Sequence, residues 1–142
     1  MVLKQYSSSV PIVKFSDFLI VAFSSPPTDT QAKQLIDDLL NAIVDIGPKA
    51  IVLDISALEV LDSYLTRVIY DIARSAKGLG TTTAIVGMRP AVAITLVSMG
   101  LESLNIPTFL SLDDLVEDVK NNGKKLYGKG DSFKAKNKFY KV

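Results

Sequence analysis

The sequence predicts an α/β fold in which a mixed, mainly parallel β-sheet is packed against amphipathic helices. Strand-like and helix-like segments alternate along residues 10–122, an order that favours right-handed crossovers between parallel strands. The segment KAIVLDI, residues 49–55, is almost wholly apolar, as expected of a central strand that is covered on both faces. The length of 142 residues suits one domain with a core of its own.

Two β-rich segments open the fold, VPIVKF at 10–15 and DFLIVAF at 17–23, and the short break between them at Ser16 suits a hairpin-like turn. From Thr28 onward the apolar spacing becomes helical. Thr28 and Gln31 predict a capping box, and Gly47 followed by proline predicts the end of the helix. The apolar positions of this helix are Ala32, Leu35, Ile36, Leu39, Leu40, Ile43 and Val44.

The second half of the chain repeats the alternation. A second helix is predicted from about Asp62 to Lys77, with Gly78 after its end. A strand at 81–87 and an apolar helix that opens with Pro90 follow. The apolar helix is too short to span a bilayer, so we expect core packing, with a protein-contact surface as the alternative. The inner face of the second helix is predicted to comprise Leu65, Val68, Ile69, Ile72, Ala73 and Ala76.

A short strand at 106–110 and a last helix complete the predicted fold. Ser111 is expected to cap this helix over LDDLVEDVKNN, and Gly123 to end it. We expect one domain over residues 1–122 and a Lys-rich tail over 123–142. The domain carries 9 basic and 14 acidic residues, whereas the tail carries 7 lysines and one aspartate. The glycines and the weak periodicity of the tail predict a disordered extension rather than a segment that binds nucleic acid or a membrane.

Composition argues against an enzyme. The chain contains neither cysteine nor histidine, which excludes disulfides, thiolate metal sites, a Ser-His-Asp triad and the commonest zinc sites. Acid pairs such as Asp54 with Glu59 are better explained as loop acids, and Asp113 with Asp114 as favourable charges in a helix first turn. We therefore predict no catalytic residue, metal or cofactor. Neither a signal peptide nor a membrane span is predicted.

Residues 77–83, KGLGTTT, suggest a glycine-rich phosphate cradle only weakly. The segment precedes a strand instead of following one, and it lacks both a third glycine and a Gly-Lys-Ser/Thr ending. We interpret Gly78 as the stop of the second helix.

The stretch VLDSYLTR, residues 60–67, places an acid and a hydroxyl at the start of the second helix. Asp62 is the simplest N-cap, which makes Ser63 the first helical residue with an exposed hydroxyl. Alternatively, Ser63 is itself the cap. Nucleophilic catalysis by Ser63 has little support because the chain has no histidine, and neither Lys77 nor Asp54 is close to it in sequence.

Three stretches carry a resemblance to a known family: IVLDISALEVLDSYLTRVI, AKGLGTTTAIVGMRPAVAITLVSMG, and the two opening strands before PPTDTQAKQLIDDLLNAI. Over roughly residues 10–121 they resemble STAS domains, the sulfate-transporter and anti-sigma-factor-antagonist family, and in particular its short stressosome antagonists of the RsbS type. A serine at the helix start, with no sensor domain before it, resembles RsbS more than the RsbR type.

The resemblance implies a cytoplasmic, non-catalytic scaffold of the stress response. In such an assembly an RsbT-like serine/threonine switch kinase is held with RsbR-like STAS co-antagonists, in homo- and hetero-oligomers, until phosphorylation releases it. Carried over, the phosphoacceptor is Ser63, and we expect Glu59, Asp62, Tyr64 and Arg67 to contact partners. Directly acting anti-anti-sigma factors commonly read Asp-Ser-Ser-Gly, unlike Asp62 to Leu65 here. Two alternatives to the scaffold remain: a directly acting anti-anti-sigma factor, and a module that binds a nucleotide or an anion at residues 55–62.

Overall fold

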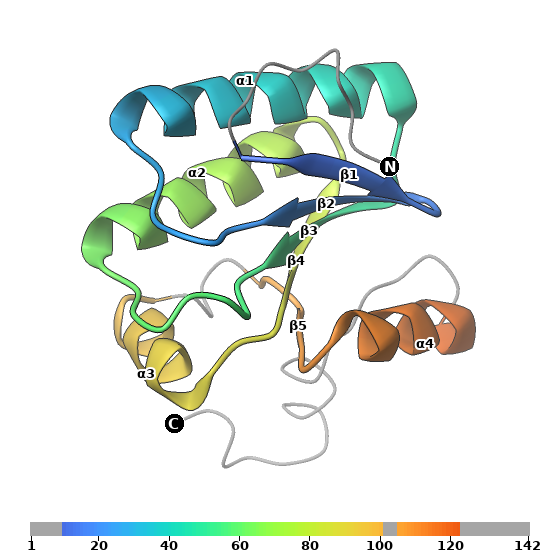
Figure 1. The fold of residues 1–142 in the computed structure, drawn as a ribbon. Coiled ribbons are helices and arrows are strands. Elements are labelled where there is room, and N and C mark those ends of the chain that lie inside the picture. Colours follow the sequence, from blue (N-terminus) through green and yellow to red (C-terminus); the bar gives the residue numbers. More distant parts are fainter. Residues whose placement is uncertain (1–9, 101–104, 123–142) are drawn as a thin grey trace.

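The computed structural model describes residues 10–100 and 105–122. It confirms the predicted α/β fold, with a five-stranded sheet in the order β1-β2-β3-β4-β5 (Figure 1). β1 and β2 form an antiparallel hairpin, and β2 to β5 are parallel. The strands are β1 (Ile12–Phe15), β2 (Phe18–Ala22), β3 (Ala50–Asp54), β4 (Thr82–Val86) and β5 (Thr108–Phe109). The helices are α1 (Asp29–Ile46), α2 (Ser63–Gly78), α3 (Pro90–Ser98) and α4 (Leu112–Asn122).

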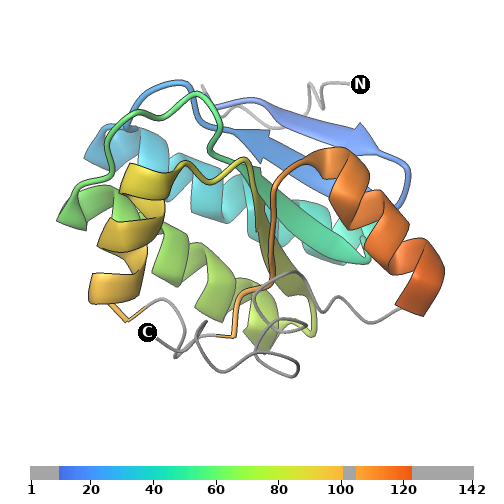
Figure 2. The same ribbon diagram turned by 90° about the horizontal axis from the view of Figure 1, so that it is seen from below.

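The helices cover the two faces of the sheet unequally. Figures 1 and 2 show α1 and α2 side by side on one face and α4 on the other. Because β2 to β5 follow one another across the sheet, right-handed crossovers place their connecting helices on the same face. Val92 and Leu96 of α3 accordingly belong to the same buried cluster as α1 and α2.

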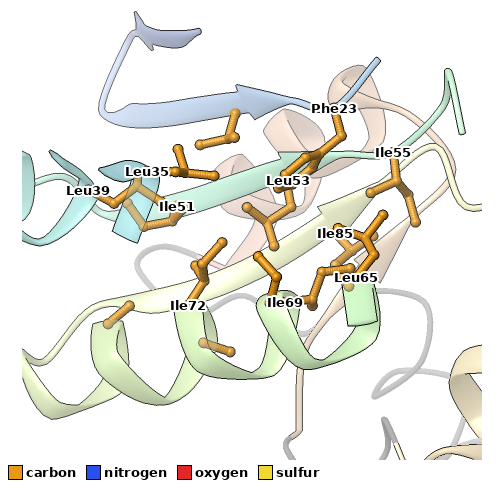
Figure 3. Close-up of a cluster of buried hydrophobic side chains, with 14 of the residues drawn as sticks. Phe23, Leu35, Leu39, Ile51, Leu53, Ile55, Leu65, Ile69, Ile72 and Ile85 are labelled. Carbon is orange, nitrogen blue, oxygen red and sulfur yellow. The ribbon is translucent and has the colours of Figure 1, made fainter. Parts of the chain in front are cut away.

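The core lies on both sides of β3, as predicted for a central strand. Ile51 and Leu53 point toward α1 and α2, whereas Ala50 and Val52 point toward the α4 side, and all four are fully buried. Figure 3 shows the larger cluster, in which side chains from α1 and α2 meet those of β3 and β4. Successive side chains of β3 thus point to opposite faces of the sheet and contribute to a buried cluster on each face.

The structure confirms the predicted helix caps of α1 and α4. The Thr28 hydroxyl accepts a hydrogen bond from the Gln31 N–H at 3.2 Å, and the Gln31 side chain accepts one from the Thr28 N–H at 3.0 Å, which completes the capping box. Gly47 ends α1 at φ +65°. The Ser111 hydroxyl accepts a hydrogen bond from the Asp114 N–H at 3.2 Å at the start of α4.

Three helix predictions need correction. Val44 is 72% exposed, because the core-facing stripe of α1 passes through Ala42 and Ile43 instead. Gly78 belongs to α2, and the following turn contains Gly80 at φ +81°. In α3 only Val92 and Leu96 are buried, so core packing accounts for only part of that helix. Gly123 and the Lys-rich tail lie outside the described residues. None of the described helices is both long and apolar enough to cross a bilayer.

Candidate phosphoacceptor site

The loop that joins β3 to α2 is anchored by apolar side chains. Ile55, Leu58 and Leu61 are all buried, and the Ile55 N–H donates to the Val86 carbonyl of β4 at 3.1 Å. Between these anchors Glu59 and Val60 are exposed. The loop is therefore fixed in position at the carboxyl ends of the strands, where α/β folds commonly place their functional groups.

The start of α2 confirms one of the two alternatives left open by the sequence. Asp62 has extended backbone geometry, and its Oδ1 accepts a hydrogen bond from the Leu65 N–H at 2.8 Å. Asp62 is therefore the N-cap. Ser63 is the first residue of the helix and is exposed. Among the described residues its hydroxyl has no hydrogen-bond partner, so the oxygen is open to an approaching enzyme.

Tyr64 links the start of α2 to the start of α1. Its side chain is half-buried and lies near the Asp29 carboxylate. Burial, followed by the nearby carboxylates of Asp29 and Asp62, raises the pKa of Tyr64 above its ordinary value of 10.0. The phenol is thus neutral at physiological pH. Sequence reasoning missed Asp29, since an acid in a helix first turn is already explained by the helix dipole.

Arg67 and Glu59 extend the charged surface around Ser63. Arg67 is exposed and lies four residues after Ser63, the spacing that makes two side chains neighbours on one side of a helix. Glu59 is exposed in the loop before the helix. Of the five predicted site residues, Glu59, Asp62, Ser63 and Arg67 are exposed and Tyr64 alone is half-buried.

A second loop, between β4 and α3, supports the first. The Arg89 Nε donates a hydrogen bond to the Ser56 carbonyl at 3.1 Å, and the Ser56 hydroxyl donates to Asp54 at 2.7 Å. Gly87, at φ +78°, packs directly on Ser56, so that an added Cβ would lie 2.6 Å from the Ser56 Cβ. The segment GMRP, residues 87–90, was noted only as part of a resemblance, and the close packing of its glycine on Ser56 could not be read from the sequence.

These contacts fix the loop and leave the Ser63 hydroxyl exposed at the start of α2. No metal cluster of three or more ligands includes Ser63 in residues 10–100 and 105–122, and the neighbouring Asp62 carboxylate is engaged as the helix cap. An unactivated serine is a poor nucleophile. At the start of α2 the Ser63 hydroxyl is exposed and takes no part in the contacts that fix the loop.

A family comparison identifies the fold. The STAS domain model matches residues 9–115, about three quarters of the chain. The chain belongs to the STAS domain family. This confirms the resemblance noted from the sequence.

Solved structures narrow the similarity within this STAS family. A serine-to-glutamate variant of RsbS from Moorella thermoacetica superposes with a TM-score of 0.72 at 40% identity, covering 83% of this chain and 100% of that one. A chain of the stressosome, described as a signal integration and transduction hub, gives a TM-score of 0.70 at 41% identity, covering 78% of this chain and 96% of that one.

A curated relative belongs to the same system but is longer. The RsbT co-antagonist protein RsbRD of Bacillus subtilis is 30% identical over 105 residues. The match covers 73% of this STAS chain but only 38% of RsbRD. The chain therefore spans well under half the length of the curated relatives it matches.

Proposed function

We propose that this STAS protein is a non-catalytic scaffold of a stressosome-type assembly that sequesters an RsbT-like switch kinase and releases it when Ser63 is phosphorylated. The observation that carries the proposal is the exposed, unpartnered Ser63 hydroxyl at the first position of α2, beside the Asp62 cap. Similarity to RsbS, to a stressosome chain and to an RsbT co-antagonist supports the choice of partners.

Phosphorylation is compatible with the fold. A phosphate on Ser63 adds about −1.5 to −2 charges at neutral pH. The N-terminus of α2 favours a nearby anion by about 0.3–1 kcal/mol at an exposed position. Arg67, one turn further along the same side of the helix, supplies a cation for the new phosphate.

The same phosphate disfavours a docked partner. Glu59, Asp62 and Asp29 already make the surroundings of Ser63 acidic. A kinase that covers this surface would have to accommodate a dianion beside existing carboxylates, and like charges brought together at an interface cost several kcal/mol. Since each 1.4 kcal/mol is a factor of ten in affinity, phosphorylation exchanges partners without unfolding the domain.

The test compares kinase binding by three purified proteins: wild type, Ser63→Asp and Asn41→Asp. Asn41 is exposed on α1, so its variant adds the same charge on a different element. We expect Ser63→Asp to bind the RsbT-like kinase at least about tenfold more weakly, and Asn41→Asp to bind like wild type. Equal binding by wild type and Ser63→Asp would refute the electrostatic release.

The assembly is tested separately. Mixed with an RsbR-like co-antagonist, the chain should elute as a particle far larger than a dimer, at a size that does not depend on the kinase. A monomer in every mixture would contradict the scaffold role and favour a directly acting antagonist.

A further inference from the structure

A cavity of about 360 Å³ lies where α2 ends and β4 begins. It is at the opposite end of α2 from Ser63, about 21 Å away by the helical rise from Ser63 to Lys77. Its polar lining consists of Lys77, Thr81, Thr82, Thr83 and Asn105. The cavity thus coincides with the segment KGLGTTT, which the proposed function at Ser63 leaves unused.

Thr83, which lines the cavity, carries a hydroxyl whose hydrogen-bonding capacity is unused. The residue is only 5% exposed, and its hydroxyl has no hydrogen-bond partner. Buried polar side chains in folded proteins nearly always have one. Thr83 lines the cavity, but its hydroxyl oxygen is itself buried, so the hydroxyl reaches an occupant only after rotation about χ1 to another staggered rotamer.

The charge of the lining selects the kind of occupant. Lys77 lies in the last turn of α2, and neither of the ion pairs formed by the described residues includes it. Asn105 and the threonines contribute neutral donors, and no carboxylate is among the described lining residues. Ammonium, amide and hydroxyl donors without an acid favour a ligand that carries an oxyanion.

Two backbone amides beside the cavity already have hydrogen-bond partners. The Gly80 N–H donates to the Lys77 carbonyl and the Thr81 N–H to the Ala76 carbonyl, each at 2.9 Å. Both amides are therefore used in ending α2. The proposed site therefore relies on side chains rather than on these two amides, unlike a glycine-rich phosphate-binding loop.

We propose that this cavity is a second binding site, for a small metabolite that carries a phosphate or carboxylate group. Lys77 faces the negative charge, and Ala73 and Ile106 provide apolar contact. The Thr83 hydroxyl, unpaired in the structure, turns about χ1 on binding and donates to one of the ligand's oxygens. The volume falls within the range of about 300–1,000 Å³ that is common for small-molecule sites. The site does not depend on the function proposed for Ser63.

The experiment titrates the full-length protein with inorganic phosphate, citrate and adenosine monophosphate at constant ionic strength, followed by amide NMR spectra. We expect at least one of these probes to produce saturable shifts at residues 80–83 and 105–106, with the amide of Ser63 unchanged. Saturable binding of phosphate alone would indicate that the site takes a free ion. Binding of citrate would indicate a ligand with carboxylate groups, and binding of the nucleotide would indicate a phosphorylated metabolite.

Two variants and a control decide the assignment. Thr83→Val keeps the side-chain shape and removes only an unpaired hydroxyl, so it should fold normally, and Lys77→Gln removes the charge. Each should weaken binding at least about tenfold, whereas Lys33→Gln, an exposed change on α1, should not. If none of the three probes saturates up to about 10 mM, about ten times a dissociation constant of 1 mM, the proposal is overturned. The cavity would then hold water alone. Binding that is equal in wild type and both site variants would overturn the proposal as well.

Discussion

The contact between Gly87 and Ser56 predicts that Gly87→Ala destabilises the protein and impairs the Ser63 site together. At φ +78°, an L-residue costs about 1–2 kcal/mol. The new Cβ would also lie 2.6 Å from the Ser56 Cβ and 3.0 Å from its Cα, and such overpacking costs about 1–3 kcal/mol. The expected loss in the free energy of unfolding is therefore about 2–5 kcal/mol.

Gly47→Ala is the matched control for this prediction. Gly47 also has a positive φ, of +65°, but nothing lies within 4 Å of an added Cβ, so only the backbone cost of about 1–2 kcal/mol applies. Urea unfolding gives both values from the shift in midpoint at constant slope. The folded fraction of Gly87→Ala should also accept phosphate more slowly at Ser63, because a displaced Ser56 shifts the loop that leads into α2. Equal destabilisation of the two variants would refute the close-packing argument.

Three further predictions concern the start of α2. Asp62→Ala should lower the free energy of unfolding by about 0.5–2 kcal/mol through loss of the cap, and Asp62→Asn by clearly less; equal losses in urea unfolding would contradict the capping role. The raised pKa of Tyr64 means that its contribution to stability is complete below pH 10 and is lost as the pH rises through the folded-state pKa. Wild type should therefore lose stability more steeply than Tyr64→Phe above pH 10, and parallel urea midpoints would count against the raised pKa of Tyr64. Ser63→Asp should keep the wild-type circular dichroism and unfold within about 1 kcal/mol of wild type, and a large drop would show that the position cannot carry negative charge.

Periodicity and capping chemistry predicted most of the fold because they are local. The capping box at Thr28, the αL glycine at position 47 and the Asp62 cap each depend on residues within one helical turn. The predictions that failed depend on tertiary context. Val44 continues an apolar pattern on α1 but points into solvent, since the helix can press only one stripe against the sheet.

The site could be predicted only in part for the same reason. Ser63 and Asp62 are neighbours in sequence, so their geometry followed from helix-capping preferences. Asp29 lies at the start of α1, and Ser56 and Arg89 lie in two loops that meet although they are 33 residues apart in the chain. No periodic signal marks such contacts.

Intact mass after incubation with the RsbT-like kinase and ATP tests the central claim most directly. The account predicts that the wild-type chain gains one phosphate, and that Ser63→Ala, which leaves the Asp62 cap in place, gains none. A phosphate that still appears on Ser63→Ala, or no phosphate on the wild-type chain with a kinase that phosphorylates its other partners, would contradict it.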